Sequence, residues 1–526
     1  MKFIAWILGI LWLSVSAQAE TGADLWLRYQ RLPSELSASY SQTIRSVQFA
    51  GSDATMAAAK DEFLAAFEGL TGKAVQQVRR PAAATLLVGT TSEKVIADLG
   101  LEDELSRAGE EGYVLRTMDV KGGSMTVVAA NSSAGALYGT FALLRRMQSG
   151  QSLENLAVVE SPKYDLRLLN HWDNLDGTVE RGYAGHSIFW NRTEEFSELE
   201  DFYRQYARAN ASIGINGTAI NNVNANPDVL TAEYIQQFAQ LADIFRPYNI
   251  RIYMSVNFAS PAVIGGLENS DPLNPDVEAW WENKVAEIYR AIPDFGGFLV
   301  KANSEGQPGP MDYGRTHQDG ANMLARVLQA HEGIVMWRAF VYEPGDDDRA
   351  RQAYNEFMPF DGKFEDNVIV QVKNGPIDFQ PREPFSPLFG AMQKTPVMLE
   401  FQITQEYLGF SDHLAYLSTM WKEVLDADTW AKGPGSTVAR TTDGTLFPQT
   451  LTAIAGVANI GRDTTWTGHH LIQSNWYAFG RLAWDHQLSS EDIADEWIKM
   501  TLSHNPAFVG PLTDMMMRSR EAWWII

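Results

Sequence analysis

Between residues 166 and 460 the chain alternates short apolar runs, rich in β-branched residues, with stretches of helical periodicity. In TAEYIQQFAQLADIF, for example, Tyr234, Phe238, Leu241 and Phe245 fall on one helical face. Eight such units with continuously apolar strands predict an α/β fold, a parallel (β/α)8 barrel, with an open doubly wound sheet as the alternative. The runs are LRLLN from Leu166, GTAIN from Gly217, IRIYMSV from Ile250, GFLVKAN from Gly297, IVMWRAFVY from Ile334, VIVQVKN from Val368, VMLEFQIT from Val397 and TAIAGVANI from Thr452.

The segments on either side of this repeat predict two further parts. Residues 20–163 mix helical stretches with strand-like runs such as TLLVGT, which is typical of a small α+β domain. The barrel is expected over 164–485. Residues 486–526 turn helical again and end on four bulky apolar residues, which predicts the start of a helical C-terminal domain that is cut short.

The N-terminus and the composition indicate an exported protein. Residues 1–19 combine Lys2, an apolar run and the A-x-A site at Ala17–Ala19, which is the layout of a cleavable secretory signal; a membrane anchor is the alternative. The chain of 526 residues has no cysteine and hence no disulfides, which favours a bacterial periplasmic or extracellular enzyme with large cores. Its net charge of −23 argues against nucleic acid as a partner.

The common motifs for metals, nucleotides and serine hydrolysis are missing from the sequence. The nine His residues show no H-E-x-x-H spacing, and neither a P-loop nor a GxSxG elbow is found. We therefore predict an enzyme that uses neither a metal nor a cofactor.

Charged residues gather at the predicted carboxyl ends of the barrel strands, where such barrels place their reacting groups. Strand parity directs Lys373 and Glu400 inward. Lys301 and Glu305 share one parity, so they point the same way as each other if the extended conformation continues. The cations are Lys301, Arg338 and Lys373, and the carboxylates at the rim are Glu305, Asp378 and Glu406.

This mixture of charges favours a carbohydrate acid as the ligand. Buried cations in an acidic protein need an anionic partner, and a bound carboxylate would supply one. Hydrolysis of a glycoside needs one protonated acid and one ionised group on the opposite face of the sugar. We infer a charged sugar acid that paired carboxylates cleave. The alternative is a set of ion pairs that only closes the top of the barrel.

Four stretches resemble the α-glucuronidases of glycoside hydrolase family 67, and the resemblance covers nearly the whole chain after residue 19. It implies an N-terminal α+β domain, a (β/α)8 barrel, and a helical C-terminal domain that completes the pocket wall and forms a homodimer. It also implies inverting removal of α-1,2-linked 4-O-methyl-glucuronic acid from the non-reducing terminal xylose of xylooligosaccharides. The stretches are NHWDNLDGTVERGYAGHSIFW from Asn170, KANSEGQPGP from Lys301, VKNGPIDFQPREP from Val372 and EFQITQEYLG from Glu400.

The resemblance also assigns roles to single residues. It implies Glu305 as general acid, Asp378 with Glu406 as activators of water, Lys301, Arg338 and Lys373 as a clamp on the uronic acid carboxylate, Trp172 in the wall of the sugar pocket and Val223 beside the 4-O-methyl group.

Two alternative functions remain. A binding protein without activity would have no reason to keep all three carboxylates, and a retaining, hexosaminidase-like barrel would leave the three cations unexplained.

Overall fold

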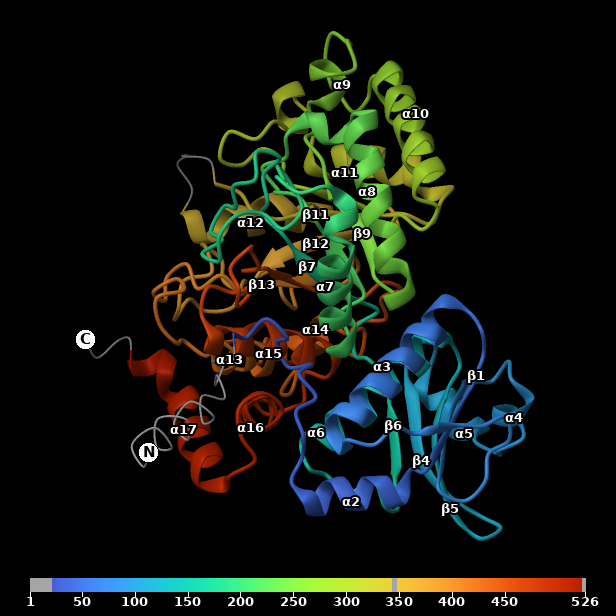
Figure 1. Ribbon diagram of the computed structural model, residues 1–526. Helices are drawn as coiled ribbons and strands as arrows, with labels where there is room; N and C mark the ends of the chain where they lie inside the picture. Colours follow the sequence, from blue (N-terminus) through green and yellow to red (C-terminus); the bar gives the residue numbers. More distant parts are fainter. Residues whose placement is uncertain (1–20, 343–347, 523–526) are drawn as a thin grey trace, which may run out of the picture.

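The computed structural model describes residues 21–342 and 348–522 of the chain (Figure 1). The predicted signal at 1–19 and the four apolar residues at the C-terminus lie outside the described residues. None of the helices described is both long and apolar enough to cross a bilayer.

Eight parallel strands close into a barrel in the order β10-β11-β12-β13-β14-β7-β8-β9. Each of the eight predicted runs contains one of these strands, so the (β/α)8 barrel is confirmed and the open sheet is wrong. The strands are β7 (Leu166–Asn170), β8 (Gly217–Ala219), β9 (Arg251–Ser255), β10 (Gly297–Val300), β11 (Ile334–Arg338), β12 (Val368–Lys373), β13 (Val397–Gln402) and β14 (Ala453–Val457).

Residues along each strand alternate between the helices and the barrel interior. In β12, Val368, Val370 and Val372 pack in the outer core, whereas Ile369 belongs to the inner cluster. Large apolar side chains fill the inside of the barrel, as in other barrels of eight strands, so polar chemistry is confined to the ends. The inner cluster includes Leu168, Tyr253, Leu299, Met336, Ile369 and Met398.

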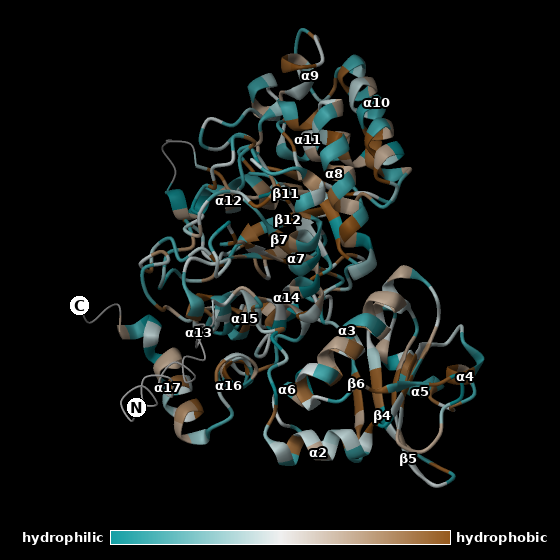
Figure 2. Ribbon diagram, viewed as in Figure 1, coloured by the Kyte–Doolittle hydropathy of each residue, from teal (hydrophilic) through white to brown (hydrophobic). Residues whose placement is uncertain are grey.

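Amphipathic helices surround the barrel (Figure 1). Figure 2 shows apolar residues along the strands and on single helix faces. The predicted face of α8 is confirmed, because Phe238, Leu241 and Phe245 are buried and Tyr234 packs beside them. The main helices are α7 (Glu200–Ser212), α8 (Ala232–Phe245), α10 (Pro275–Ala291), α11 (His317–Gln329), α12 (Arg349–Phe357), α13 (Ser418–Asp426), α14 (Val438–Thr442) and α15 (Gln473–Trp484).

A separate six-stranded sheet in the N-terminal part has the order β2-β1-β3-β5-β4-β6. Its strands are β1 (Ser46–Ala50), β2 (Gln76–Gln77), β3 (Thr85–Thr90), β4 (Tyr113–Val120), β5 (Gly123–Ala130) and β6 (Ala157–Glu160). The helices are α2 (Ser34–Thr43), α3 (Ala54–Thr71), α4 (Lys94–Ala97), α5 (Glu102–Ala108) and α6 (Ser133–Gln148). Both α3 and α6 share a core with one face of the sheet, and α5 packs in a second cluster with the other.

In the part of the chain that the structure describes, two helices follow the barrel, α16 (Ser490–Thr501) and α17 (Pro506–Ala522). Trp497 and Ile498 of α16 are completely buried, and Ser489 caps the start of this helix through the backbone N–H of Asp492. The helical character expected after residue 485 is thus present in the residues described.

Candidate active site

All predicted charged residues lie at or just beyond the carboxyl ends of the barrel strands. Lys301 directly follows β10, and Arg338 and Lys373 are the last residues of β11 and β12. Because the strands are parallel, these ends meet at one rim, where barrel enzymes place their reacting groups.

The first ion pair joins Lys301 and Glu305. The Nζ atom of Lys301 lies 2.5 Å from Oε2 of Glu305 and 2.8 Å from Oδ1 of Asn224. The lysine side chain is buried, whereas Glu305 is 42% exposed. Burial lowers the pKa of Lys301, and the nearby positive charge of Arg338 lowers it further, although Glu305 opposes both.

The loop after β10 departs from the extended conformation on which the parity argument depended. The strand ends at Val300, and Asn303 and Glu305 have left-handed φ angles of 47° and 50°. The side chain of Asn303 makes hydrogen bonds inside the loop: it accepts from the N–H of Met311 and donates to the carboxylate of Asp312. A turn therefore brings Glu305 to Lys301.

The second pair, Arg338 with Glu400, is completely buried inside the rim. Nε and Nη2 of Arg338 donate three hydrogen bonds of 3.0–3.1 Å to the Glu400 carboxylate. The guanidinium group also lies 5.6 Å from the ring centres of Trp172 and Phe340. None of the hydrogen bonds given for the described residues involves Nη1 of Arg338.

The third pair joins Lys373 and Asp378. Nζ of Lys373 lies 2.5 Å from Oδ1 of Asp378, and the Tyr407 hydroxyl donates to Oδ2. Burial lowers the pKa of Lys373 to about 8, even though Asp378 opposes this change. Burial alone would raise the pKa of Asp378, but the charge of Lys373 and the two hydrogen bonds outweigh it and lower this pKa.

Glu406 is held by a residue from a distant loop. Arg181, which lies between β7 and α7, donates from Nε to Oε1 of Glu406 at 2.5 Å. Gln402 of β13 donates to Oε2 at 2.8 Å. Both oxygens of this carboxylate thus have a fixed donor.

Trp172 and Val223 lie together on the inner side of the rim. Both are buried in the cluster that fills the barrel, together with Phe379, whose ring centre lies 6.4 Å from that of Trp172. The indole Nε1 of Trp172 is buried and has no hydrogen-bond partner in the described structure. The same holds for both side-chain amide atoms of Asn170 and of Gln371. Unpaired polar groups at a strand end are points where a polar ligand could bind.

Residues at or beside the three carboxylates have left-handed backbone conformations. Phe379 and Gln405, which are neighbours of Asp378 and Glu406, have φ angles of 42° and 58°, and Glu305 itself has a positive φ. Such conformations cost about 1–3 kcal/mol each for residues other than glycine. Strain of this kind persists where the surrounding structure fixes the backbone, and it is frequent at active sites.

The structure therefore brings the eight predicted site residues to one rim, and it pairs each of the three cations with a carboxylate. The ion pairs that the sequence left open as an alternative are present. Sequence reasoning missed Arg181, Asn224 and Tyr407, and it did not foresee that Glu400 neutralises Arg338. Within residues 21–342 and 348–522, no three His, Asp or Glu side chains form a group suited to a metal ion.

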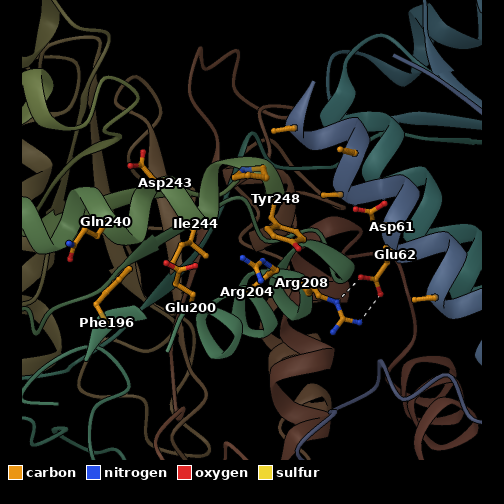
Figure 3. Close-up of a pocket in the computed structure, with 15 residues that line it drawn as sticks. Asp61, Glu62, Phe196, Glu200, Arg204, Arg208, Gln240, Asp243, Ile244 and Tyr248 are labelled. Carbon is orange, nitrogen blue, oxygen red and sulfur yellow. Dashed lines mark hydrogen bonds and ion pairs between the residues drawn. The ribbon is translucent and has the colours of Figure 1, made fainter. Parts of the chain in front are cut away.

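A groove of about 960 Å³ elsewhere in the molecule contains none of these residues (Figure 3). It lies between α3 of the N-terminal part and α7 and α8 of the barrel. Arg208 lines the groove and donates to both oxygens of Glu62, at 2.6 and 2.9 Å. This groove belongs to the junction of the two parts rather than to the rim.

Comparison with protein families agrees with the fold. The family model described as the middle domain of glycosyl hydrolase family 67 matches residues 146–466. The chain belongs to glycosyl hydrolase family 67. The models of the N-terminus and C-terminus of this family match residues 25–143 and 467–524.

Two similar curated proteins come from fungi. The chain is 44% identical to alpha-glucuronidase A of Emericella nidulans over 536 residues, covering 97% of this chain and 62% of the relative. It is 40% identical to the alpha-glucuronidase of Hypocrea jecorina, covering 96% of this chain and 61% of that protein. The chain thus spans about three fifths of the length of these relatives.

Solved structures share the fold at low sequence identity. A family 115 4-O-methyl-alpha-glucuronidase with specificity for decorated arabinogalactans has a TM-score of 0.56 at 13% identity, covering 91% of this chain and 61% of that one. A chitobiase of Flavobacterium johnsoniae has a TM-score of 0.52 at 13% identity, covering 91% and 71%. At this identity the likeness concerns the fold alone.

Proposed function

We propose that this chain is an inverting α-glucuronidase that removes α-1,2-linked 4-O-methyl-D-glucuronic acid from the non-reducing terminal xylose of xylooligosaccharides. The observation that carries the proposal is the set of three carboxylates, Glu305, Asp378 and Glu406, beside three buried cations on one barrel rim. The names of the curated relatives support the same activity.

Glu305 acts as the general acid. Its carboxyl group is partly exposed, so it reaches a leaving oxygen at the mouth of the barrel. It gives its proton to the oxygen of the departing xylose while the bond from that oxygen to the anomeric carbon breaks. Lys301 has three N–H donors, so it keeps its hydrogen bonds to Asn224 and to Oε2 of Glu305 and donates the third to the uronate. Glu305 then carries its proton on Oε1.

Asp378 and Glu406 activate the attacking water. They follow β12 and β13, and β13 is three positions from β10 in the barrel, so Glu406 lies across the mouth from Glu305. The low pKa of Asp378 keeps it ionised and able to accept a hydrogen bond from water. Inversion needs acid and base roughly 6.5–9.5 Å apart, with one water between the base and the anomeric carbon.

The uronic acid carboxylate binds to Lys301, Lys373 and Nη1 of Arg338. Arg338 is already fixed by Glu400, so its remaining donor is held in place before the substrate arrives. Trp172 packs on the sugar ring, and Val223 leaves room for the 4-O-methyl group.

The proposal is tested by incubating the chain with aldouronic acids and following the products by NMR. Initial release of the β-anomer of 4-O-methyl-glucuronic acid is the expected result, and initial α-anomer would rule out inversion. Binding without release would show a protein that recognises uronic acid oligosaccharides but does not cleave them. The variant Glu305→Ala is expected to lose most of the activity, and unchanged turnover would exclude Glu305 as the acid.

We also propose that the chain works outside the cytoplasm, in the periplasm or the medium of a bacterium. The secretory pattern at residues 1–19 and the lack of cysteine support this proposal. Sequencing the N-terminus of the protein recovered from culture fractions would test it, and an uncleaved N-terminus in the cytoplasm would contradict it.

A further inference from the structure

Glu180 and Arg181 are neighbours in the loop between β7 and α7, and the proposed mechanism does not use them. The backbone holds this loop over the rim. The N–H of Glu180 donates to the carbonyl oxygen of Trp172 at 2.9 Å, and Asp173 pairs with Val179 as an antiparallel bridge. Arg181 has a left-handed φ of 56°, a conformation that non-glycine residues rarely adopt without support.

Glu180 is connected to the proposed acid by an unbroken chain of hydrogen bonds. Its Oε2 accepts from the amide groups of Asn222 and Asn224, both at 2.9 Å. Asn224 in turn accepts from Lys301 at 2.8 Å, and Lys301 donates to Glu305 at 2.5 Å. Because Glu180 accepts from the amide group of Asn224, the amide oxygen is the atom that faces Lys301.

Arg181 points to the other side of the mouth, where it binds Glu406. This ion pair of 2.5 Å leaves Glu406 only 12% exposed, while Arg181 is 47% exposed. Gln402 holds the second oxygen of the same carboxylate. Adjacent residues in one loop therefore contact the network of the acid and the proposed base.

We propose that Glu180 and Arg181 are positioning residues that together set the spacing between acid and base. This inference rests on the proposed function. Glu180 acts through Asn224 and Lys301 on Glu305, and Arg181 acts directly on Glu406. Because the two residues are consecutive, the acid and the base are both held by contacts to the same short segment of backbone. These contacts fix the distance between the two carboxyl groups. Inversion depends on this separation, and an error of about 1 Å in such a site costs on the order of 100-fold in rate.

Two substrates distinguish the two roles. An aldotriouronic acid needs the proton of the acid to release xylose, whereas α-D-glucuronosyl fluoride releases fluoride with little help from an acid. Both substrates need an activated water. A defect on the acid side should therefore affect the oligosaccharide selectively, and a defect on the base side should affect both substrates.

The variant Glu180→Ala is expected to lose roughly 100-fold in kcat on the oligosaccharide and less than about 5-fold on the fluoride, with KM nearly unchanged. Asn224→Ala breaks the same chain one step further on and should give the same selective loss. Glu180→Gln keeps an acceptor for both asparagines and should recover most of the activity.

The variant Arg181→Met is expected to lose roughly 100-fold in kcat on both substrates. Arg181→Lys should recover part of this loss, because it restores a charge beside Glu406 but not the planar donor group. The matched control is Asp176→Asn in the same loop, since the side chain of Asp176 is exposed and, among the residues described, accepts hydrogen bonds only from Thr178. This variant should behave as the wild type.

The outcomes separate the two proposals. If the wild type is active and Glu180→Ala loses both activities equally, or if Glu180→Ala or Arg181→Met stays within about threefold of the wild type, the positioning roles are wrong and the enzyme assignment stands. If the wild type hydrolyses neither substrate, the proposed function fails and the positioning roles fail with it. Melting curves of all variants, followed by circular dichroism, check whether a loss of activity comes from unfolding.

Discussion

At the scale of single residues, each buried cation at the rim is paired with a carboxylate. Burial makes an unpaired charge at these positions unfavourable. Lys373 is the clearest case. Removing its ammonium group from water lowers its pKa to about 8, Asp378 opposes this change, and Arg338 adds to it. A lysine with this pKa changes charge within an ordinary assay range, so its contribution to substrate binding depends on pH.

We predict that kcat/KM for glucuronosyl oligosaccharides falls above about pH 8. Because the pKa of Lys373 is lowered, its proton is present below pH 8 and lost as the pH rises through that value. The clamp on the uronate then loses a charge. Arginine stays charged throughout, so the variant Lys373→Arg should move this decline to higher pH. A pH profile of the two proteins checks this, and an unmoved alkaline limb in the variant would exclude Lys373 as its origin.

We predict that breaking the ion pair of Arg338 and Glu400 destabilises the fold. Both side chains are at most 1% exposed, so Glu400→Gln leaves a buried guanidinium group without its counter-charge. Removing one partner of a buried pair costs about 3–5 kcal/mol in the free energy of unfolding. Urea denaturation measures this loss. The control is Asp294→Asn, which breaks the more exposed pair with Arg246 and should cost under about 1 kcal/mol. Equal effects of both changes would show that burial is not the cause.

At the scale of elements, the strands could be predicted from the sequence because each one is visible as an apolar run of consecutive residues. Alternation alone gave the inward direction of Lys373 and Glu400, which the register and the two clusters confirm. The contact of Arg181 with Glu406 joins residues 225 positions apart, and no pattern within one strand or loop contains it. The turn that brings Glu305 to Lys301 was missed because the expectation extended the strand beyond Val300.

We predict that the first residue of β10 must be glycine for this strand to pack against β11. Gly297 has a φ of 133°, and an added Cβ would lie 2.0 Å from the carbonyl oxygen of Ile334 in β11. Gly297→Ala therefore combines backbone strain with a backbone clash. Gly266→Ala is the control, because Gly266 has a φ of 71° but open space around it. We expect Gly297→Ala to lower the free energy of unfolding by at least about 2 kcal/mol more than the control. Equal losses in denaturant titrations would mean that the neighbouring strand adjusts.

At the scale of the whole molecule, the N-terminal part is fixed to the end of the barrel opposite the rim. Glu111 accepts from Arg167 at the start of β7, from Asn216 directly before β8 and from Asn249 two residues before β9. One carboxylate thus contacts the amino ends of three successive strands. Contacts at this face of a barrel serve stability, whereas the chemistry belongs to the other face.

We predict that Glu111→Ala destabilises the protein without changing its chemistry. The completely buried Arg167 would lose its counter-charge, which costs about 3–5 kcal/mol, while kcat at low temperature should stay within about twofold. Thermal unfolding followed by circular dichroism, together with assays at 15 °C or so, measures both effects. The control is the exposed neighbour Glu110→Ala, which should melt as the wild type does.

The dependence on pH gives this prediction a second test. Burial would raise the pKa of Glu111, but the charge of Arg167 and the hydrogen bonds outweigh it and lower this pKa. A carboxylate with a lowered pKa stabilises the fold above its usual titration range and loses this contribution as the pH falls through its folded pKa. The difference in Tm between the wild type and Glu111→Ala should therefore be largest near neutral pH and should shrink in acid. A difference that stays constant from pH 7 to pH 3 or so would show that the lost interaction is packing rather than charge.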